Sequence, residues 1–523
     1  MPADVQLAVS RIASVNPATG EVLGELDCAG PAEVHAAVSQ ARISQPEWAA
    51  SGIRTRIKTI RRFQQLLLAR KDDIARRITQ EMGKPYVESL LTEVLVVLDA
   101  ARFVVENAYS FLRDERVAHG NPATKTKSGR ILREPYGVIG IISPWNYPFS
   151  IPATEALAAL VAGNAVVLKP SEFTPLIAVE LGSLLHEAGV PEAVFQVLAG
   201  DGAAGAALVK SEIDKLIFTG SVATGKRIAQ TAAERLLPVV LELGGKDPML
   251  VLDDADLDVA SSAAVWGAFC NAGQACLSVE RCYVHEKLYS AFVDACAAKA
   301  RKLRVGNGLD QNTEVGPMIH ERQLRIVESH VEDARSLGAR VLTGGSRLRE
   351  LGPNFFSPTV LADVNHAMRV MREETFGPVL PIMPFHDDDE AVRLANDCDY
   401  GLAASVWTRD RARGEALARR IEAGTVMVND VLSCFGISEA PHGGVKGSGL
   451  GRTHGRWGLD EMVRVKYIDS DLVPRMKKIW WFGYGGNFSR EMESFLDLLF
   501  ATPLRQKLKA MLRSLGALGR RKL

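Results

Sequence analysis

Apolar positions in the early part of the chain recur at spacings of three and four residues. After a short opening marked by proline and glycine, this spacing runs from about Pro31 to Arg113, and it is clear in the segment RRFQQLLLARKDDIARRI. Residues three and four apart lie on one face of an α-helix, so the pattern predicts a series of amphipathic helices. No motif with visible chemistry falls within them.

From Arg133 the pattern changes to short runs of β-branched and apolar residues. The runs VIGII, AVVLK and LIFTG alternate with helical stretches such as ALAALVAG, and a second set follows Gly245, with PMLVL, RCYVHE, RVLTGG, VLPIMPF, ASVWT and TVMVND. This alternation is typical of parallel sheets wound with helices. The sequence therefore predicts an α/β protein with two α/β domains, and no short-period repeat or low-complexity linker marks their boundary.

Length and charge narrow the class of protein. The chain has 523 residues, 47% of them apolar, which predicts at least two packed domains. Its 62 basic and 62 acidic residues give a formal net charge of zero, which argues against a general nucleic-acid-binding surface. The charge is uneven, however: residues 473–523 hold eleven basic side chains against three acidic ones, so this tail carries +8 and the body −8.

Cysteine usage and the apolar runs bear on location. The odd number of cysteines, with no CxxC pair and no zinc-like spacing, predicts a reducing cytosol and no metal site. The opening MPADVQLAVSR has no basic start followed by an apolar core, and no run of eighteen apolar residues occurs. We therefore expect a cytoplasmic protein that neither is secreted nor spans a membrane. The seven cysteines are Cys28, Cys270, Cys276, Cys282, Cys296, Cys398 and Cys434.

Two segments are candidates for binding a dinucleotide. In AVVLKPSE, a strand from Ala165 to Lys169 is broken by Pro170 and delivers Glu172 beyond its carboxyl end, where open α/β sheets bind ligands. A carboxylate there accepts hydrogen bonds from adenosine ribose hydroxyls, and Lys169 adds donors. Taken alone, this segment reads more simply as a solvated loop charge.

In the second segment, the strand KLIFTG runs into Ser221 and a helix. Gly220 and Gly225 allow a tight turn, and the N-terminus of the helix offers free N–H groups to a pyrophosphate, joined by the Ser221 hydroxyl. The spacing is not the GxGxxG fingerprint, and the acidic residue lies upstream of the glycines. As a lone motif it is weak.

Three further residues have the chemistry of a reaction centre. Cys276 in CNAGQACLSVE is a soft nucleophile, and Glu242 in ELGGKDP can act as a base toward water. Asn146 in PWNYP can stabilise an oxyanion through its side-chain N–H. Each also has a simpler interpretation: a small core cysteine, a surface glutamate and a turn-forming asparagine.

Seven motifs follow one another along the chain. They are PWNYP (144–148), KPSE (169–172), FTGS with Gly225 (218–225), ELGGK (242–246), NAGQAC (271–276), EETFGPV (373–379) and PHGGVKGSGLGR (441–452). Together, in this order and spacing, they resemble the aldehyde dehydrogenase superfamily over roughly residues 10 to 470. A chance match of one motif is easy, but a chance match of all seven in order is not. WNYPF is similar to the fatty and aromatic aldehyde branch of that superfamily.

The resemblance implies a role for each matching residue. Cys276 is the implied nucleophile, Glu242 the general base and Asn146 the oxyanion donor, assisted by the backbone N–H of Cys276. Water activated by Glu242 would release an acid from a thioester, whereas CoA-acylating relatives use a second thiol. NAD is the expected cofactor, with NADP possible. The implied dinucleotide contacts are Lys169 and Glu172 at the adenosine ribose, Gly220, Ser221 and Gly225 at the pyrophosphate, and Glu374 and Phe376 at the nicotinamide ribose and ring.

The resemblance also implies a domain organisation and an assembly. It divides the chain into a Rossmann-like cofactor domain, an α/β catalytic domain, a small β flap that pairs subunits into a homodimer or homotetramer, and a C-terminal extension. The expected bounds are 1–118 and 137–244 for the cofactor domain, 245–445 for the catalytic domain, 119–136 and 446–472 for the flap, and 473–523 for the extension.

Two features depart from the family pattern. His442 stands where the family most often has phenylalanine, near the expected substrate mouth, and the tail beyond about Val473 is not required by the family. In the tail, Ile479, Trp480, Trp481 and Phe482 with Tyr484 form an aromatic cluster suited to a lipid interface. After Pro503, apolar residues at helical spacing alternate with basic ones, which predicts either a peripheral helix on anionic lipid or a helix packed on protein. These residues are Leu504, Leu508, Met511, Leu512, Leu515 and Leu518, with Arg505, Lys507, Lys509 and Arg513.

Two rival functions stay open. One is an NADP-preferring semialdehyde dehydrogenase, whose substrate carries a distal carboxylate that needs a basic partner. WNYPFSIPATEALAAL contains no basic residue, and Cys276 stands between Ala275 and Leu277, so we expect an apolar aldehyde, aliphatic or aromatic. The other rival is a non-catalytic protein on the same fold. The joint presence of Cys276, Glu242 and Asn146 argues against it.

Overall fold

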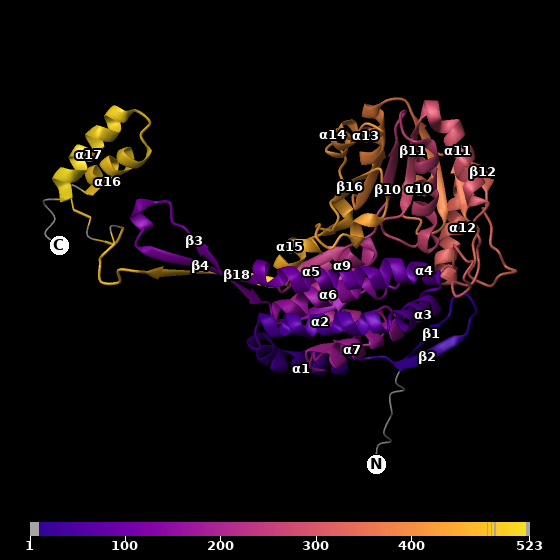
Figure 1. Cartoon of the computed structure of the whole chain (residues 1–523), viewed down its shortest axis with the longest axis horizontal. Coiled ribbons are helices and arrows are strands. Elements are labelled where there is room, and N and C mark those ends of the chain that lie inside the picture. The colour runs from indigo at the N-terminus through magenta and orange to yellow at the C-terminus, as the bar shows by residue number, and fades with distance from the viewer. Residues whose placement is uncertain (1–9, 479, 483, 486–487, 519–523) are drawn as a thin grey trace, which may run out of the picture. The chain divides into compact units, whose positions relative to one another are not determined.

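The computed structural model describes residues 10–478, 480–482, 484–485 and 488–518 (Figure 1). A hairpin of β1 (Arg11–Val15) and β2 (Val22–Asp27) opens the chain. The predicted helical region follows and is confirmed. Its helices are α1 (Pro31–Ala50), α2 (Ile53–Ala69), α3 (Lys71–Met82), α4 (Tyr86–Ser89) and α5 (Leu95–Leu112).

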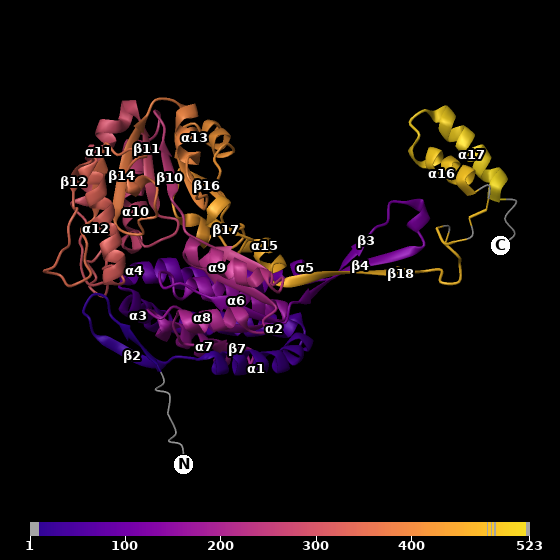
Figure 2. The ribbon, with the colours of Figure 1, turned by 180° about the vertical axis from the view of Figure 1, so that it is seen from behind.

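A six-stranded sheet in the order β17-β9-β8-β5-β6-β7 forms the first α/β layer, and its strands are parallel except for β17. Figure 2 shows α7 and α8 near β7. The central strands are buried along their whole length because helices cover the sheet. The strands are β5 (Val138–Ile142), β6 (Ala165–Lys169), β7 (Phe195–Val197), β8 (Lys215–Thr219), β9 (Val239–Glu242) and β17 (Gly449–Leu450); the helices are α6 (Ser150–Ala162), α7 (Pro175–Ala188), α8 (Gly202–Lys210) and α9 (Val222–Ala233).

A seven-stranded sheet in the order β12-β13-β14-β11-β10-β15-β16 forms the second α/β layer, with only β12 antiparallel. Figure 1 shows α10 beside β10 and β11. The strands are β10 (Asp247–Val251), β11 (Val279–His285), β12 (Arg340–Thr343), β13 (Thr359–Ala362), β14 (Val379–Phe385), β15 (Ala403–Trp407) and β16 (Thr425–Val428). The helices are α10 (Leu257–Phe269), α11 (Glu286–Ala300), α12 (Glu321–Ser336), α13 (Asp388–Asn396) and α14 (Arg411–Ala418).

A three-stranded antiparallel sheet joins two distant segments of the chain. Its order is β18-β4-β3, with β3 (Glu115–Val117), β4 (Lys127–Pro135) and β18 (Val463–Asp471). The described residues of 114–132 and 467–518 form a compact unit of their own, which includes α16 (Phe488–Phe500) and α17 (Leu504–Leu518). The rest of the described chain forms the other unit. The described residues of the predicted aromatic cluster lie in the smaller unit, whereas Ile479 falls outside the described residues; the described ones are Trp480, Trp481, Phe482 and Tyr484.

The segment 446–472 is divided between two sheets, whereas we expected all of it to join the flap strands. β17 pairs with β9 of the six-stranded sheet, and α15 (Gly455–Asp460) packs against α5 and α6. Only β18 belongs to the three-stranded sheet. The remaining domain bounds stay a prediction.

Candidate active site

Four of the predicted segments meet at one edge of the six-stranded sheet. Asn146 follows β5, Lys169 ends β6, Ser221 follows β8 and Glu242 ends β9. These strands run parallel, so their carboxyl ends lie at the same edge, which is where open α/β sheets bind ligands. Strand direction therefore gathers residues that are almost a hundred positions apart in the sequence.

The loop between α10 and β11 carries Cys276. Asn271 and Ala272 adopt left-handed backbone conformations, with φ of 52° and 54°. The Gln274 side chain then fixes the turn: its Nε2 donates to the Asn271 carbonyl at 3.1 Å, and its Oε1 accepts from the Ile319 N–H at 2.9 Å. A tight, hydrogen-bonded turn of this kind holds the half-buried Cys276 in one place.

Burial raises the pKa of the Cys276 thiol well above its ordinary value, and the carboxyl groups of Asp247, Glu374 and Glu242 add to the rise. The thiol is therefore protonated at neutral pH in the protein alone. A positive charge brought close to the sulfur would favour the thiolate, which is the nucleophilic form.

Glu242 ends β9 with its carboxylate inside the protein. Both of its oxygens are buried and have no hydrogen-bond partner among the described residues. Burial raises the pKa of Glu242 to about 8, against a lowering by the Arg452 charge. A carboxyl group with a pKa in this range takes and returns a proton near neutral pH, which suits it to act as a general base.

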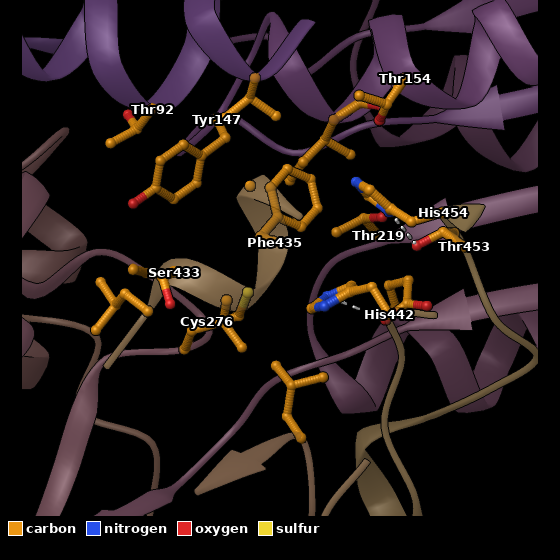
Figure 3. Close-up of a pocket in the computed structure, with 18 of the residues that line it drawn as sticks. Thr92, Tyr147, Thr154, Thr219, Cys276, Ser433, Phe435, His442, Thr453 and His454 are labelled. Carbon is orange, nitrogen blue, oxygen red and sulfur yellow. Dashed lines mark hydrogen bonds and ion pairs between the residues drawn. The ribbon is translucent and has the colours of Figure 1, made fainter. Parts of the chain in front are cut away.

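Cys276 and Glu242 line the same cavity, which has a volume of about 300 Å³. Figure 3 shows Cys276 among the residues of its wall. Most of its wall is apolar, with Val96, Leu277 and Leu402 among the lining residues. Among the described residues, neither a lysine nor an arginine lines it. A nucleophile and a base therefore face one largely apolar chamber that suits a small organic substrate.

Asn146 is tied directly to the loop of Cys276. Its Nδ2 donates to the carbonyl of Gln274 at 3.1 Å, and its own carbonyl accepts from Lys84 Nζ at 2.8 Å. Lys84 also forms an ion pair with Glu93 at 2.8 Å, and both side chains are completely buried. Glu93 in turn accepts from the Ser150 N–H at 2.7 Å, at the start of α6. This network fixes the PWNYP turn against the cysteine loop.

The turn after β8 has the geometry predicted for binding a pyrophosphate. Ser221 is the N-cap of α9, and its hydroxyl accepts from the Thr224 N–H at 3.3 Å. Gly225 packs so tightly that an added Cβ would overlap Leu243, just after β9, and Gly220 is crowded in the same way by Phe218. The glycines therefore let the backbone approach closely, and the helix N-terminus is exposed to accept an anion.

Lys169 and Glu172 lie together beyond β6. The Lys169 Nζ is 3.5 Å from a Glu172 carboxylate oxygen. Lys169 is buried and burial lowers its pKa, whereas the Glu172 side chain is 38% exposed. Neither residue, nor Ser221, lines the cavity of Cys276. The structure thus separates these three from the reacting pair.

The loop that carries Glu374 and Phe376 is held by a buried carboxylate, Glu280. Glu280 accepts from the N–H groups of Thr375 and Phe376 at 2.9 and 2.8 Å and forms an ion pair with Lys246. Phe376 has a left-handed φ of 51°. Glu374 accepts from the Gly245 N–H at 3.2 Å, and burial raises its pKa to about 8.

His442 lies in the cavity wall next to the base. Its Nε2 is 3.8 Å from a Glu242 carboxylate oxygen, and its ring meets Phe435 edge-on at 5.1 Å between centroids. Burial lowers the pKa of His442 to about 3, so the imidazole is neutral at neutral pH. The departure from phenylalanine at this position therefore adds a polar group to the wall without adding a charge.

Four positioning residues were not found from the sequence: Lys84, Glu93, Gln274 and Glu280. Each acts by holding a loop rather than by carrying a reactive group. Lys84 and Glu93 fall in or beside the predicted helices, where isolated charges normally face solvent. Gln274 lies within the NAGQAC motif, which was its only signal, whereas Glu280 lies four residues after Cys276 and outside that motif.

Comparison with known proteins agrees with this geometry. The model of the aldehyde dehydrogenase family matches residues 5–468. The 4,4'-diapolycopene aldehyde oxidase of Methylomonas sp is 41% identical over 495 residues, covering 94% of this chain and 92% of that protein. The mitochondrial succinate-semialdehyde dehydrogenase of Oryza sativa subsp. japonica is 38% identical, covering 87% of this chain and 85% of that one. The crystal structure of an NAD-dependent aldehyde dehydrogenase from Sinorhizobium meliloti superposes with a TM-score of 0.86 at 38% identity. The match covers 90% of this chain and 93% of that chain.

The chain belongs to the aldehyde dehydrogenase family. It is therefore an oxidoreductase with the α/β fold of that family, as the sequence motifs predicted.

Proposed function

We propose that this protein oxidises an aldehyde to the carboxylic acid with a nicotinamide dinucleotide, through a thioester on Cys276. The observation that carries the proposal is the shared cavity, which holds the Cys276 thiol and the unpartnered Glu242 carboxyl group. Asn146 is joined to the same loop through Gln274. These are the nucleophile, the base and the oxyanion donor that the reaction needs.

The proposed steps follow from the residues. The Cys276 thiolate attacks the aldehyde carbon, and the Asn146 amide with the Cys276 N–H stabilises the oxyanion. When the carbonyl re-forms, hydride leaves the carbon and a thioester remains. Glu242 then takes a proton from water, the hydroxide attacks the thioester, and the acid departs while Cys276 regains its electron pair. A bound oxidised nicotinamide would supply the hydride acceptor and a positive charge that favours the thiolate.

The chain's own residues fit such a dinucleotide. The exposed N-terminus of α9 with Ser221 suits the pyrophosphate, and the crowded glycines leave the backbone free to approach it. Glu172, partly exposed beside Lys169, suits the ribose hydroxyls of the adenosine. Glu374 and Phe376, held by Glu280, are suited to the nicotinamide ribose and ring. We therefore assign these residues to cofactor binding.

Catalytic efficiency should be higher with NAD than with NADP. A carboxylate at position 172 accepts from the ribose 2′-hydroxyl and repels a 2′-phosphate. Glu172→Gln should therefore raise kcat/KM for NADP by about tenfold, since one charge repulsion of this kind is worth about 1.4 kcal/mol. Steady-state kinetics with each cofactor test this. A wild-type enzyme that clearly favours NADP contradicts it.

We propose an uncharged, apolar aldehyde, aliphatic or aromatic, as the substrate. In the part of the chain that the structure describes, the cavity wall has no lysine or arginine to pair with a distal carboxylate, and it carries the carboxyl groups of Glu155 and Glu242. A semialdehyde that ends in a carboxylate would lose its hydration without gaining a partner.

A substrate panel tests this choice together with the proposed function. Hexanal and benzaldehyde should be oxidised with a kcat/KM at least about a hundredfold above that for succinic semialdehyde, because an unpaired buried charge costs several kcal/mol. The measurement is the absorbance of the reduced cofactor. If no aldehyde reduces either cofactor, the proposed function fails; if succinic semialdehyde is preferred, only the substrate assignment fails.

We also propose a homodimer or homotetramer in which the three-stranded sheet continues across subunits. β18 lies at an edge of that sheet, and its side chains are mostly exposed, including Val465 at 70% and Tyr467 at 49%. A long edge strand with apolar side chains favours pairing with another strand.

The C-terminal tail is proposed to attach the enzyme to anionic lipid as a peripheral contact. Trp480, Trp481 and Phe482 are exposed, Phe482 at 96%. α16 packs against α17, and apolar side chains remain exposed on both helices. No helix among the described residues is long and apolar enough to cross a bilayer. An apolar surface flanked by basic side chains suits the face of an anionic membrane. The exposed apolar residues of the two helices are Leu496, Phe500, Leu504, Leu508 and Met511.

Co-sedimentation with phosphatidylserine vesicles tests the tail. The full chain should pellet with these vesicles and be released by salt, because charge attraction between exposed groups is screened. A chain truncated after Asp471 should stay in the supernatant with unchanged specific activity. If the full chain also stays in the supernatant, the tail packs on protein instead, and sedimentation equilibrium of both chains shows whether it joins subunits.

A further inference from the structure

One side of the active-site cavity carries buried polar atoms that have no partner among the described residues. They are Glu155 Oε2, His442 Nδ1 and His454 Nε2, and all three residues line the cavity. Figure 3 shows the His442 and His454 imidazoles reaching into the pocket. Buried polar atoms are normally hydrogen-bonded. A molecule bound in the cavity can therefore form hydrogen bonds with these three atoms.

Burial favours the uncharged form of each of these groups. Burial lowers the pKa of His454 to about 4 and that of His442 to about 3. Burial also raises the pKa of Glu155 well above its ordinary value, and the charge of Glu242 adds to the rise. A protonated carboxyl group and a neutral imidazole each offer one donor and one acceptor. This side of the cavity therefore suits a neutral polar group.

Glu155 and His454 lie where the main cavity adjoins a second, smaller one. The second cavity has a volume of about 30 Å³, and Thr154, Glu155, Thr453 and His454 line both. Cys276 lines only the larger one. Glu155 and His454 thus lie where the substrate chamber adjoins a small space that Cys276 does not line.

Local contacts hold these two side chains in place. His454 Nδ1 is 3.1 Å from the Thr453 hydroxyl, and its ring packs against Phe435 at 4.6 Å between centroids. Glu155 Oε1 is 3.4 Å from the Thr219 hydroxyl. In each residue one polar atom has a protein neighbour, and the other, Nε2 or Oε2, is left for a ligand.

We propose that Glu155 and His454 form a hydrogen-bonding subsite for a hydroxyl group carried by the aldehyde substrate on the part of its chain beyond the reacting carbonyl. The proposal rests on the function proposed above and names a substrate class: hydroxyaldehydes with an apolar body. A hydroxyl both donates and accepts, as the two neutral side chains require. It also replaces the water that would otherwise satisfy them.

Matched substrates test the subsite. Kinetics are measured with NAD on a series of n-alkanals and on the ω-hydroxyalkanals of equal chain length. At the best chain length, the hydroxyaldehyde should have a kcat/KM roughly tenfold higher than the n-alkanal of equal length. A factor of this size corresponds to the net contribution of one or two hydrogen bonds. Glu155→Leu and His454→Leu should each bring this ratio close to one.

Two control variants separate recognition from packing. Glu155→Gln keeps a neutral donor and acceptor and should keep most of the preference. Val96→Ala, in the apolar wall, should lower kcat/KM for both members of a pair and leave their ratio unchanged. If Glu155→Leu does not fold, Glu155→Gln and His454→Leu still show whether the preference comes from hydrogen bonding to the hydroxyl or from packing.

Three results would overturn the subsite. One is a wild-type enzyme that oxidises alkanals with no preference for a hydroxyl at any length. Another is a preference that survives both leucine variants. The third is a stronger preference for an ω-ammonium aldehyde, which would mean that Glu155 is ionised. Failure to oxidise any aldehyde in the series is a different result, because it overturns the proposed function itself.

Discussion

Replacing Cys276 with alanine should lower steady-state turnover by about a thousandfold or more, while the cofactor still binds. Loss of a nucleophile that forms the covalent intermediate removes the pathway itself, so the effect is of the largest class that single substitutions produce. Binding should persist because Ser221, Lys169 and Glu172 lie outside the cavity of Cys276. Turnover is followed by absorbance of the reduced cofactor, and binding by titration calorimetry.

Cys434 provides the matched control. It is buried in a small apolar cluster with Leu277 and Leu402, beside the catalytic loop, but it does not line the cavity. Cys434→Ala should keep turnover within a fewfold of the wild type. Near-normal turnover in Cys276→Ala, or equal loss in both variants, would remove Cys276 from the proposed role.

Replacing Glu242 with glutamine should slow steady-state turnover by about a hundredfold or more, yet leave a first burst of reduced cofactor. Hydride transfer precedes hydrolysis, so only the later step loses its base. In the wild type, burial raises the pKa of Glu242 to about 8, and only the ionised form accepts a proton. Turnover limited by hydrolysis should therefore rise with pH through about 8 and level off above it, and Glu242→Gln should lack this rise.

Stopped-flow and steady-state measurements on the same Glu242→Gln preparation separate the two steps. A burst that is lost together with the steady-state rate would place Glu242 before hydride transfer. An unchanged steady-state rate at neutral pH would take it out of the mechanism.

The sequence was informative where a local pattern sets the structure. Short β-branched runs between helices predicted the parallel strands, and β5, β6 and β8 lie where VIGII, AVVLK and LIFTG stand. Because parallel strands end at one edge, the residues that follow them had to converge there. The roles of Cys276, Glu242 and Asn146 came from the family motifs, since each residue alone has a common structural meaning.

The sequence did not predict the features that depend on contacts between residues far apart along the chain. The Lys84–Glu93 ion pair and the Glu280 carboxylate are buried, and no periodicity distinguishes a buried charge from an exposed one. The strand β17 has only two residues, Gly449 and Leu450, which is too few for a pattern. In the tail, the helix after Pro503 was predicted and is present as α17, whereas α16 was not predicted.

The central claim is the thioester on Cys276, and peptide mass spectrometry of Glu242→Gln tests it most directly. The variant is mixed with NAD and a reactive aldehyde such as hexanal, quenched in acid within the burst, digested and analysed. Fragmentation of the peptide that contains Cys276 should place the mass of the acyl group on Cys276 itself, and hydroxylamine should remove it. An acyl group on another cysteine, such as Cys270, or no covalent adduct despite a full burst of reduced cofactor, would contradict the account.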